Sequence, residues 1–278
     1  MAAGLAGVLA PAFGWAPALG GTALTAAPFR AMLDWPGFWR AAALALGTGL
    51  AATALSLGLA LALCAGWSGT AAFGVARRAL SPFLAAPHAA AAFGLAFLIA
   101  PSGWIARALS PWATGWERPP DLLIVGDPLG LSLVAGLALK ETPFLLLMML
   151  AALGQVDERR SLLAARSMGY GRVAGWLKAV APQVWPQLRL PVAAVLAYSV
   201  STVDVALILG PSAPPPLAVQ ALRWATDPDL SRRFVAAAAA VALLALTLAA
   251  LGLWRLGEAG LGLLAARWRE GGARWRRD

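Results

Sequence analysis

Long apolar runs separated by short charged segments are the main pattern along this chain. A helix of roughly 20 apolar residues crosses a hydrocarbon core of about 30 Å. We predict six such spans, at about 5–27, 41–66, 82–105, 131–154, 191–210 and 234–254. The pattern therefore predicts an all-α fold, a polytopic membrane helix bundle with about six transmembrane helices.

The ends of the chain differ from its middle. Residues 1–29 contain no charged side chain, and a signal peptide would begin with basic residues, so we expect a first span there. We divide the chain into an N-terminal span and link (1–40), a membrane domain (41–255) and a basic tail (256–278). The tail carries Arg267, Arg269, Arg274, Arg276 and Arg277.

Composition agrees with a membrane setting and narrows the chemistry. Hydrophobic residues make up 60% of the chain and charged residues 13%, whereas soluble domains carry about 25% charged residues. Cys64 and His88 are the single cysteine and histidine. We therefore expect no disulfide framework, no cysteine metal site and no histidine cluster. We also predict no bound metal and no catalytic residues.

One amphipathic, basic stretch, residues 161–191, stands between two apolar runs. Leucine and alanine favour a short helix over 161–168, and Gly169 and Gly171 favour a turn, since glycine adopts positive φ without strain. A second short helix is predicted over 172–181, ended by Pro182, which lacks a backbone donor. The stretch is thus a helix-turn-helix suited to docking.

This stretch resembles the EAA loop of permease subunits from binding-protein-dependent ABC importers. That motif runs Glu-Ala-Ala, three residues, Gly, nine residues, Ile, one residue, Leu-Pro. Its Ala, Ala, Gly and Pro fall on Ala164, Ala165, Gly169 and Pro182. Three positions depart from the motif, since Leu163, Ala179 and Ala181 replace Glu, Ile and Leu; Glu158 lies upstream.

The resemblance implies that the loop, at about 155–190, is a cytoplasmic coupling element that docks on a separate ABC ATPase. Ala164, Ala165, Gly169 and Pro182 would take the coupling role. The basic residues at that interface would be Arg166, Arg172 and Lys178. The chain has no Gly-x-x-x-x-Gly-Lys-Ser/Thr loop for nucleotide phosphates. We expect it to bind no cofactor and to be no enzyme, with ATP used by the partner ATPase.

Basic residues predict the orientation. With six spans and a cytoplasmic N-terminus, fourteen Lys and Arg residues fall on the side of the loop and seven on the other, with Lys140 inside a span. Because basic residues concentrate in the cytoplasm, we expect the EAA loop and the tail there. The net charge of +9 then reflects topology and requires no nucleic acid.

Further partners follow from the resemblance alone. It implies a second permease copy or a paralogue, a periplasmic solute-binding protein and a bacterial inner (plasma) membrane. The pattern is similar to permeases of the thiamine, iron, sulfate, molybdate and polyamine branch. Solute specificity in such systems usually resides in the binding protein, so the sequence of this chain does not identify the transported solute.

Charges within predicted spans are candidates for the translocation pathway, because they are costly in lipid. Asp204 is the first of these, and Lys140 and Glu141 are the others. A structural role is the alternative. Asp204 would then pair with Lys140 or bond to Thr202, and Lys140 and Glu141 would neutralise each other near a kink at Pro143.

Two other classes of protein remain open. Gly66-Trp67-Ser68-Gly69 has the form of the nucleophile motif of rhomboid proteases, but a serine needs a base, and His88 is the one histidine and fits helix packing better. A secondary transporter would show inverted repeats and broken helices at matched positions. Dependence on an ATPase distinguishes it from a permease.

Overall fold

The computed structural model describes residues 2–271, and almost all of its regular structure is helical. The predicted tail residues Arg274, Arg276 and Arg277 lie outside the described residues. The α-helices are α1 (Ala2–Ala12), α2 (Ala27–Leu33), α3 (Phe38–Trp67), α4 (Ala71–Ala85), α5 (His88–Ile99), α6 (Trp104–Leu109), α7 (Leu131–Leu153), α8 (Glu158–Ser167), α9 (Arg172–Gly175), α10 (Ala181–Ser201), α11 (Asp204–Leu209), α12 (Leu217–Ala225) and α13 (Arg232–Glu270). A 3-10 turn, η1 (Pro17–Leu19), a π-turn, η2 (Trp176–Val180), and two short strands, β1 (Trp15–Ala16) and β2 (Gly21–Thr22), complete the fold.

Four segments of the described chain are long and apolar enough to cross a membrane. They are α3, the stretch His88–Leu109 that contains α5 and α6, α7, and α13. The prediction of an all-α polytopic membrane bundle is confirmed, with four candidate spans in the described residues where about six were predicted. The predicted spans at 41–66 and 131–154 match α3 and α7, and α13 extends well beyond the predicted 234–254.

The predicted first span is wrong, because residues 5–27 do not form one helix. After α1 the chain turns into an antiparallel hairpin, in which Trp15 pairs with Thr22 and Ala16 with Gly21. Gly14 and Gly20 adopt φ of 81° and 83°, a region that other residues avoid. The apolar composition of this segment suggested one helix, but turns at Gly14 and Gly20 interrupt it.

The predicted third span, 82–105, is divided. Helix α4 ends at Ala85, and Ala86 is extended with ψ of 133°, as expected for a residue that precedes a proline. A new helix, α5, begins at His88. Pro87 therefore separates an amphipathic helix from the apolar stretch that follows it.

The predicted fifth span, 191–210, begins too late, and Pro182 does not end a helix. The helical chain runs from α9 through the π-turn η2 into α10, where Pro182 occupies the second position. In the π-turn the Ala181 N–H donates to the carbonyl of Trp176, five residues earlier. Such wide turns interrupt the regular hydrogen bonding of an α-helix. Pro182 lies directly after the π-turn, and the helix continues through it. The helix then ends at Ser201, and a short α11 follows.

The chain divides into two compact units. Unit 1 comprises residues 1–51, 88–137 and 197–250, and unit 2 comprises residues 52–87, 138–196 and 251–278. The helices α3, α7, α10 and α13 each contribute a segment to both units.

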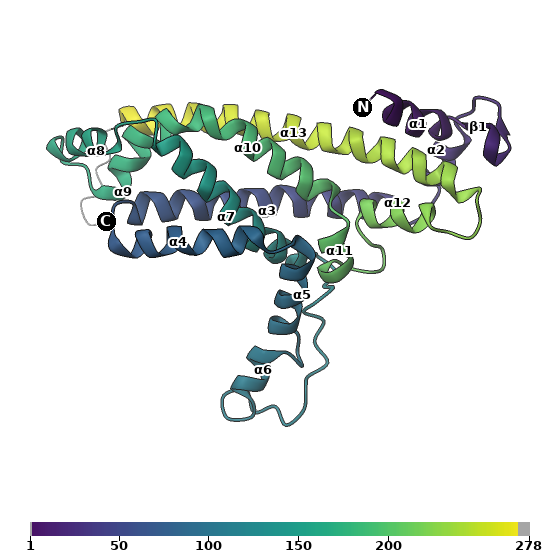
Figure 1. Ribbon diagram of the computed structural model, residues 1–278, viewed down its shortest axis with the longest axis horizontal. Helices are drawn as coiled ribbons and strands as arrows, with labels where there is room; N and C mark the ends of the chain where they lie inside the picture. Colours follow the sequence, from purple (N-terminus) through teal and green to yellow (C-terminus); the bar gives the residue numbers. More distant parts are fainter. Residues whose placement is uncertain (1, 272–278) are drawn as a thin grey trace. The chain divides into compact units, whose positions relative to one another are not determined.

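Unit 1 has its core where α2, the first part of α3, α12 and the first part of α13 meet. Met32, Phe38 and Leu217 are buried there, and the rings of Trp35 and Trp224 meet edge to face at 5.3 Å. Helix α5 lies against α11 in the same unit (Figure 1).

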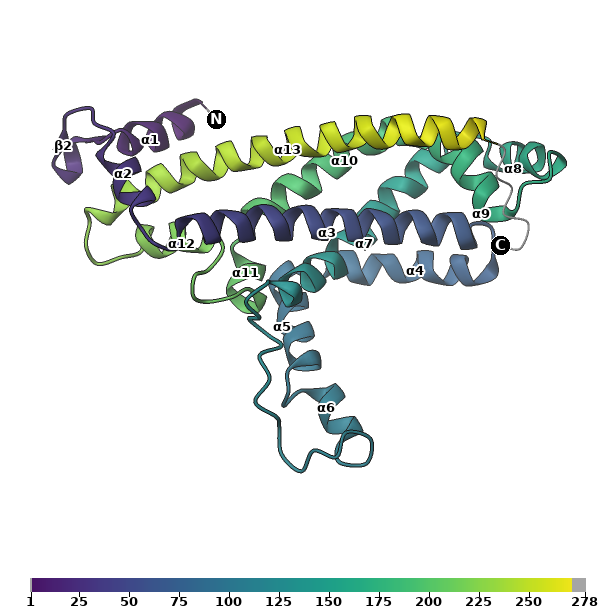
Figure 2. The same ribbon diagram turned by 180° about the vertical axis from the view of Figure 1, so that it is seen from behind.

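Unit 2 has a larger core formed by the second part of α3, α4, α7, η2 and α10. Its buried side chains include Leu145, Met149, Trp176 and Val184. Helix α4 runs alongside the second part of α3, and α8 and α9 lie next to each other (Figure 2). This core carries the predicted coupling loop.

Candidate functional site

Residues 158–180 form a helical hairpin, which we call the 158–180 hairpin, and the predicted helix-turn-helix is present. Asp157 caps its first helix, because its Oδ1 accepts the backbone N–H of Arg160 at 2.9 Å. Such side-chain caps satisfy one of the free donors at a helix start. The sequence therefore sets the beginning of α8.

The turn of the hairpin is a Schellman motif centred on Gly169. Gly169 adopts φ of 80°, its N–H donates to the Arg166 carbonyl at 2.9 Å, and the Tyr170 N–H donates to the Ala165 carbonyl at 3.1 Å. These two bonds are those of a helix C-terminus closed by a left-handed residue. The predicted bend at Gly169 is therefore present.

Small residues let the two helices of the hairpin approach closely. Ala165 is buried, and a Cβ placed on Gly175 would lie 3.1 Å from the Ala165 methyl group. Any side chain at Gly175 would push the helices apart. Ala165 therefore packs inside the hairpin, whereas Ala164 lies on the exposed face of α8.

Glu158 points inward to the second helix. Its Oε1 accepts the indole N–H of Trp176 at 3.0 Å, and Trp176 is fully buried. This bond links the start of α8 to the π-turn η2. Glu158, which lies upstream of the position of the motif's missing Glu, thus stabilises the hairpin itself.

The side chains of two of the three predicted basic residues, Arg172 and Lys178, donate hydrogen bonds to segments outside the hairpin. The guanidinium of Arg172 donates to the Ser68 carbonyl, in the turn between α3 and α4. The Lys178 Nζ donates to the Trp268 carbonyl at 2.9 Å and lies 4.8 Å from the centre of the Tyr170 ring. Arg166 is exposed on α8. The first two cations thus tie the hairpin to other helices of unit 2.

The exposed face of α8 and its end carries apolar side chains. Leu163 and Met168 are each 56% exposed, and Ala164 lies beside Leu163 on the same exposed turn. These apolar side chains lie on a segment that is otherwise rich in charged residues. We call Leu163, Ala164 and Met168 the α8 patch.

The candidate pathway residues fall in separate units. In unit 1, Oδ1 of Asp204 accepts bonds from Thr202 Oγ1 at 2.9 Å and from Tyr198 Oη at 3.3 Å. Asp204 also lines a groove of about 750 Å³ whose other walls are mostly apolar, with Phe93 and Phe97 from α5. The predicted bond to Thr202 is present, and the carboxylate is also exposed to this groove.

In unit 2, Lys140 and Glu141 are both buried. Lys140 Nζ donates to the carbonyls of Phe83 at 2.8 Å and Ala86 at 2.6 Å. A cation at this place satisfies the last carbonyls of α4 and complements its dipole. This geometry supports the structural role of Lys140 at the break before Pro87.

Ser68 and His88, the two residues on which the protease alternative depends, do not form a nucleophile and base pair among the described residues. The Ser68 hydroxyl is buried and has no hydrogen-bond partner among the described residues. The ring of His88 packs against the Tyr198 ring at 4.8 Å, as predicted for a packing residue. No general base contacts Ser68 in the described part of the chain.

Sequence reasoning missed the internal contacts of the hairpin. Trp176 and Trp268 were not singled out, and Ser68 was considered only as a possible nucleophile, although each of the three holds a residue of the loop. A tryptophan within a basic, amphipathic segment was the available signal for Trp176. Nothing in the sequence indicated that Ser68 and Trp268 would meet the hairpin, since they lie far from it in the chain.

Fold and site together define a polytopic membrane protein that carries a helical hairpin between α7 and α10. The chain is similar to the inner membrane ABC transporter permease protein YnjC of Escherichia coli (strain K12), with 36% identity over 165 residues. The matched segment makes up 59% of this chain and 30% of that protein, so the chain spans about a third of the relative's length. No protein-family model matches the chain. The predicted resemblance to ABC transporter permeases is confirmed, and the substrate branch stays a prediction.

Proposed function

We propose that this chain is a membrane permease subunit of an ATP-driven ABC importer and that its 158–180 hairpin docks on a separate ATPase. The α8 patch is the observation that carries the proposal. It presents Leu163, Ala164 and Met168 on a hairpin that is held from inside by Glu158, Trp176 and Gly169. A rigid element with an apolar exposed face can transmit a movement of its partner to the helices behind it.

The connections of the hairpin support this coupling. Through Arg172 it contacts the turn after α3, and through Lys178 it contacts the last turns of α13. Through η2 it continues without a break into α10. A displacement of the hairpin would therefore reach three long helices.

The remaining partners belong to the same proposal. A second permease copy or a paralogue would complete the solute route, and a periplasmic binding protein would deliver the solute. ATP would bind to the ATPase, with the hairpin in the cytoplasm and the chain in the bacterial inner membrane. Similarity to an inner membrane permease supports this setting.

Asp204 is our candidate for the solute route. Its carboxylate lies at the edge of the groove along α5 and is held by Thr202 and Tyr198. A carboxylate within a predicted span is a functional candidate by default, and this one lies beside apolar walls. Replacing it with asparagine keeps the size and removes the charge.

Co-purification with an ABC ATPase that is co-expressed with this chain tests the docking surface. We expect Leu163→Ser to weaken the binding of the ATPase by about tenfold or more, since burial of a leucine contributes about 1.5–3 kcal/mol and about 1.4 kcal/mol is a factor of ten in affinity. Leu256→Ser is the matched control, because Leu256 is 72% exposed on α13 of the same unit. Equal membrane levels of the variants must be shown.

Two results would contradict the proposal. If the wild-type chain recovers no ATPase, the proposal of an ATP-driven importer fails, and a secondary transporter becomes the better hypothesis. If both leucine variants recover as much ATPase as the wild type, docking does not use the α8 patch.

A further inference from the structure

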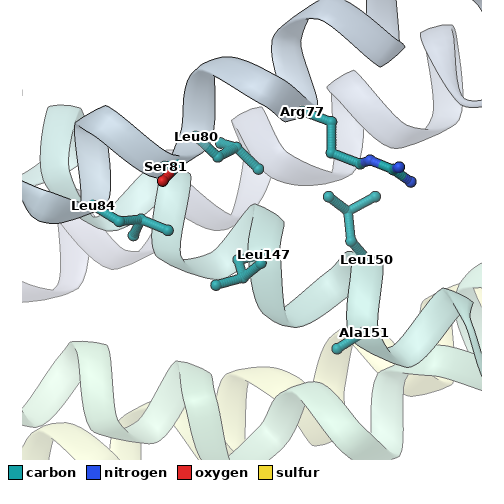
Figure 3. Close-up of a pocket in the computed structure, with 7 residues that line it drawn as sticks. All are labelled: Arg77, Leu80, Ser81, Leu84, Leu147, Leu150 and Ala151. Carbon is teal, nitrogen blue, oxygen red and sulfur yellow. The ribbon is translucent and has the colours of Figure 1, made fainter.

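An open groove of about 540 Å³ runs between α4 and α7 within unit 2. Its walls are formed by leucines from both helices, namely Leu80, Leu84, Leu147 and Leu150. Arg77 stands at one end, beside Leu150 (Figure 3). The groove is therefore mostly apolar, with Ser81 as a polar residue in its lining, and it is positively charged at one end.

The charge of Arg77 is not neutralised by the chain. Arg77 is exposed, and the described residues give it no hydrogen bond or ion pair. Its neighbour Arg78 is also exposed on α4 but does not line the groove. The groove thus holds one free cation next to an apolar channel.

The position of the groove fits one leaflet of a membrane. Helix α3 has 30 residues and is about 45 Å long, so its end at Trp67 reaches beyond a hydrocarbon core of about 30 Å. The turn to α4 follows at once, and Arg77 lies within the first turns of α4. From Arg77 to Leu84 the groove extends about 10 Å along the helix, which is comparable to the depth of one leaflet.

We propose that this groove binds an anionic glycerophospholipid, with its phosphate on Arg77 and one acyl chain along the four leucines. The guanidinium offers several donors in a fixed geometry that suits phosphate oxygens. Basic pockets between membrane helices are a recurrent way to hold anionic headgroups. This site is independent of ATP-driven transport and needs only a membrane around the chain.

A second copy of the chain is a poorer occupant of the groove. The chain carries a net charge of +9, so a second copy offers Arg77 few carboxylates. Three carboxylates of unit 2 already have partners within the chain. Asp157 caps α8, Glu158 accepts from Trp176, and Glu258 accepts from Trp185 and Arg189. An anionic lipid supplies the missing charge and the apolar filling together.

Native mass spectrometry of the detergent-purified chain with added phosphatidylglycerol or phosphatidylcholine tests the proposal. We expect the wild type to retain phosphatidylglycerol in preference to phosphatidylcholine. Arg77→Gln should weaken phosphatidylglycerol binding about fivefold, as expected for one basic residue at a charged membrane surface. Arg78→Gln is the matched control and should bind as the wild type does.

A second variant tests the apolar part of the groove. Ala151 lines it and is exposed, so Ala151→Phe should fill it and lower the retention of phosphatidylglycerol while Arg77 is unchanged. Equal retention of both lipids, or equal loss in the two arginine variants, would overturn the site. Displacement of the lipid by inorganic phosphate would show a free-phosphate site instead, and loss of a dimer in Ala151→Phe without loss of lipid would assign the groove to a second copy.

Discussion

The indole N–H of Trp176 donates to Oε1 of Glu158 at 3.0 Å, and this bond joins the two helices of the 158–180 hairpin. Trp176 is fully buried, whereas Glu158 is only half-buried at the first turn of α8. An acidic residue there also complements the helix dipole. The bond therefore holds the start of α8 against η2.

Removing this bond should loosen the hairpin. Trp176→Phe keeps an aromatic ring but leaves the carboxylate without its donor, which costs about 1–2 kcal/mol. We expect the apparent melting temperature in detergent to fall by about 2–4 °C. Trp104→Phe, at an exposed site of α6, is the control, and equal shifts in both variants would show that the bond does not contribute.

Substitution of Gly169 by any other residue should destabilise the hairpin. Because its φ is 80°, Gly169→Ala should destabilise the hairpin by about 1–2 kcal/mol. Gly169→Pro should do more, since proline cannot adopt this φ or donate to the Arg166 carbonyl. Hydrogen exchange of residues 158–180 measures the effect.

The control for this position is another glycine of unit 2. Gly74 lies inside α4 with open space around its Cα. Gly74→Ala should leave the hairpin unchanged and stabilise α4 by about 0.5–1 kcal/mol. Faster exchange of the hairpin in Gly74→Ala would refute this explanation of the turn.

Gly49 allows α3 to approach α10 in unit 1. A Cβ on Gly49 would lie 2.5 Å from Cγ2 of Val200 and 3.0 Å from its backbone nitrogen. Gly49→Ala should therefore cost about 1–3 kcal/mol through overpacking, visible as a lower melting temperature. Gly47→Ala, in the same helix, meets nothing within 4 Å and should not lower it; a loss as large as that of Gly49→Ala would contradict the packing argument.

Asp127 should make the start of α7 sensitive to acid. Partial burial would raise the pKa of its carboxyl, but hydrogen bonds from Ser132 and from the backbone of Leu131 outweigh burial and hold the pKa below its ordinary value. Both backbone N–H groups lie 2.8 Å from the carboxylate. The folded state therefore binds the proton less readily than the unfolded state does.

The sign of the pH effect follows from this shift. The stabilisation is fully present above the unfolded pKa of about 4 and is lost as the pH falls through the lower folded pKa. Asp127→Asn should lack this dependence, because the amide does not titrate in this range. Melting curves between pH 6 and about pH 3 measure it, and the prediction is refuted if the variant loses the same stability as the wild type.

Much of the architecture could be predicted from local patterns. The predominantly apolar runs at 41–66 and 131–154 correspond to α3 and α7, because their length and composition alone favour a helix in lipid. The bend at Gly169 was predictable because a single residue type accommodates positive φ. The first span and the role of Pro182 were not, since composition does not reveal how backbone bonds are redistributed at turns and at a π-turn.

By itself, the sequence determined that this is an all-α membrane protein with a basic, EAA-like helix-turn-helix, because hydrophobic length, charge placement and motif spacing are local properties. Only the tertiary structure decided which loop residues face inward. It turned Glu158, Arg172 and Lys178 toward Trp176, Ser68 and Trp268 and left Leu163 and Met168 exposed. Those contacts join residues up to about a hundred positions apart, such as Ser68 and Arg172. They depend on how helices pack, which no spacing along one chain specifies.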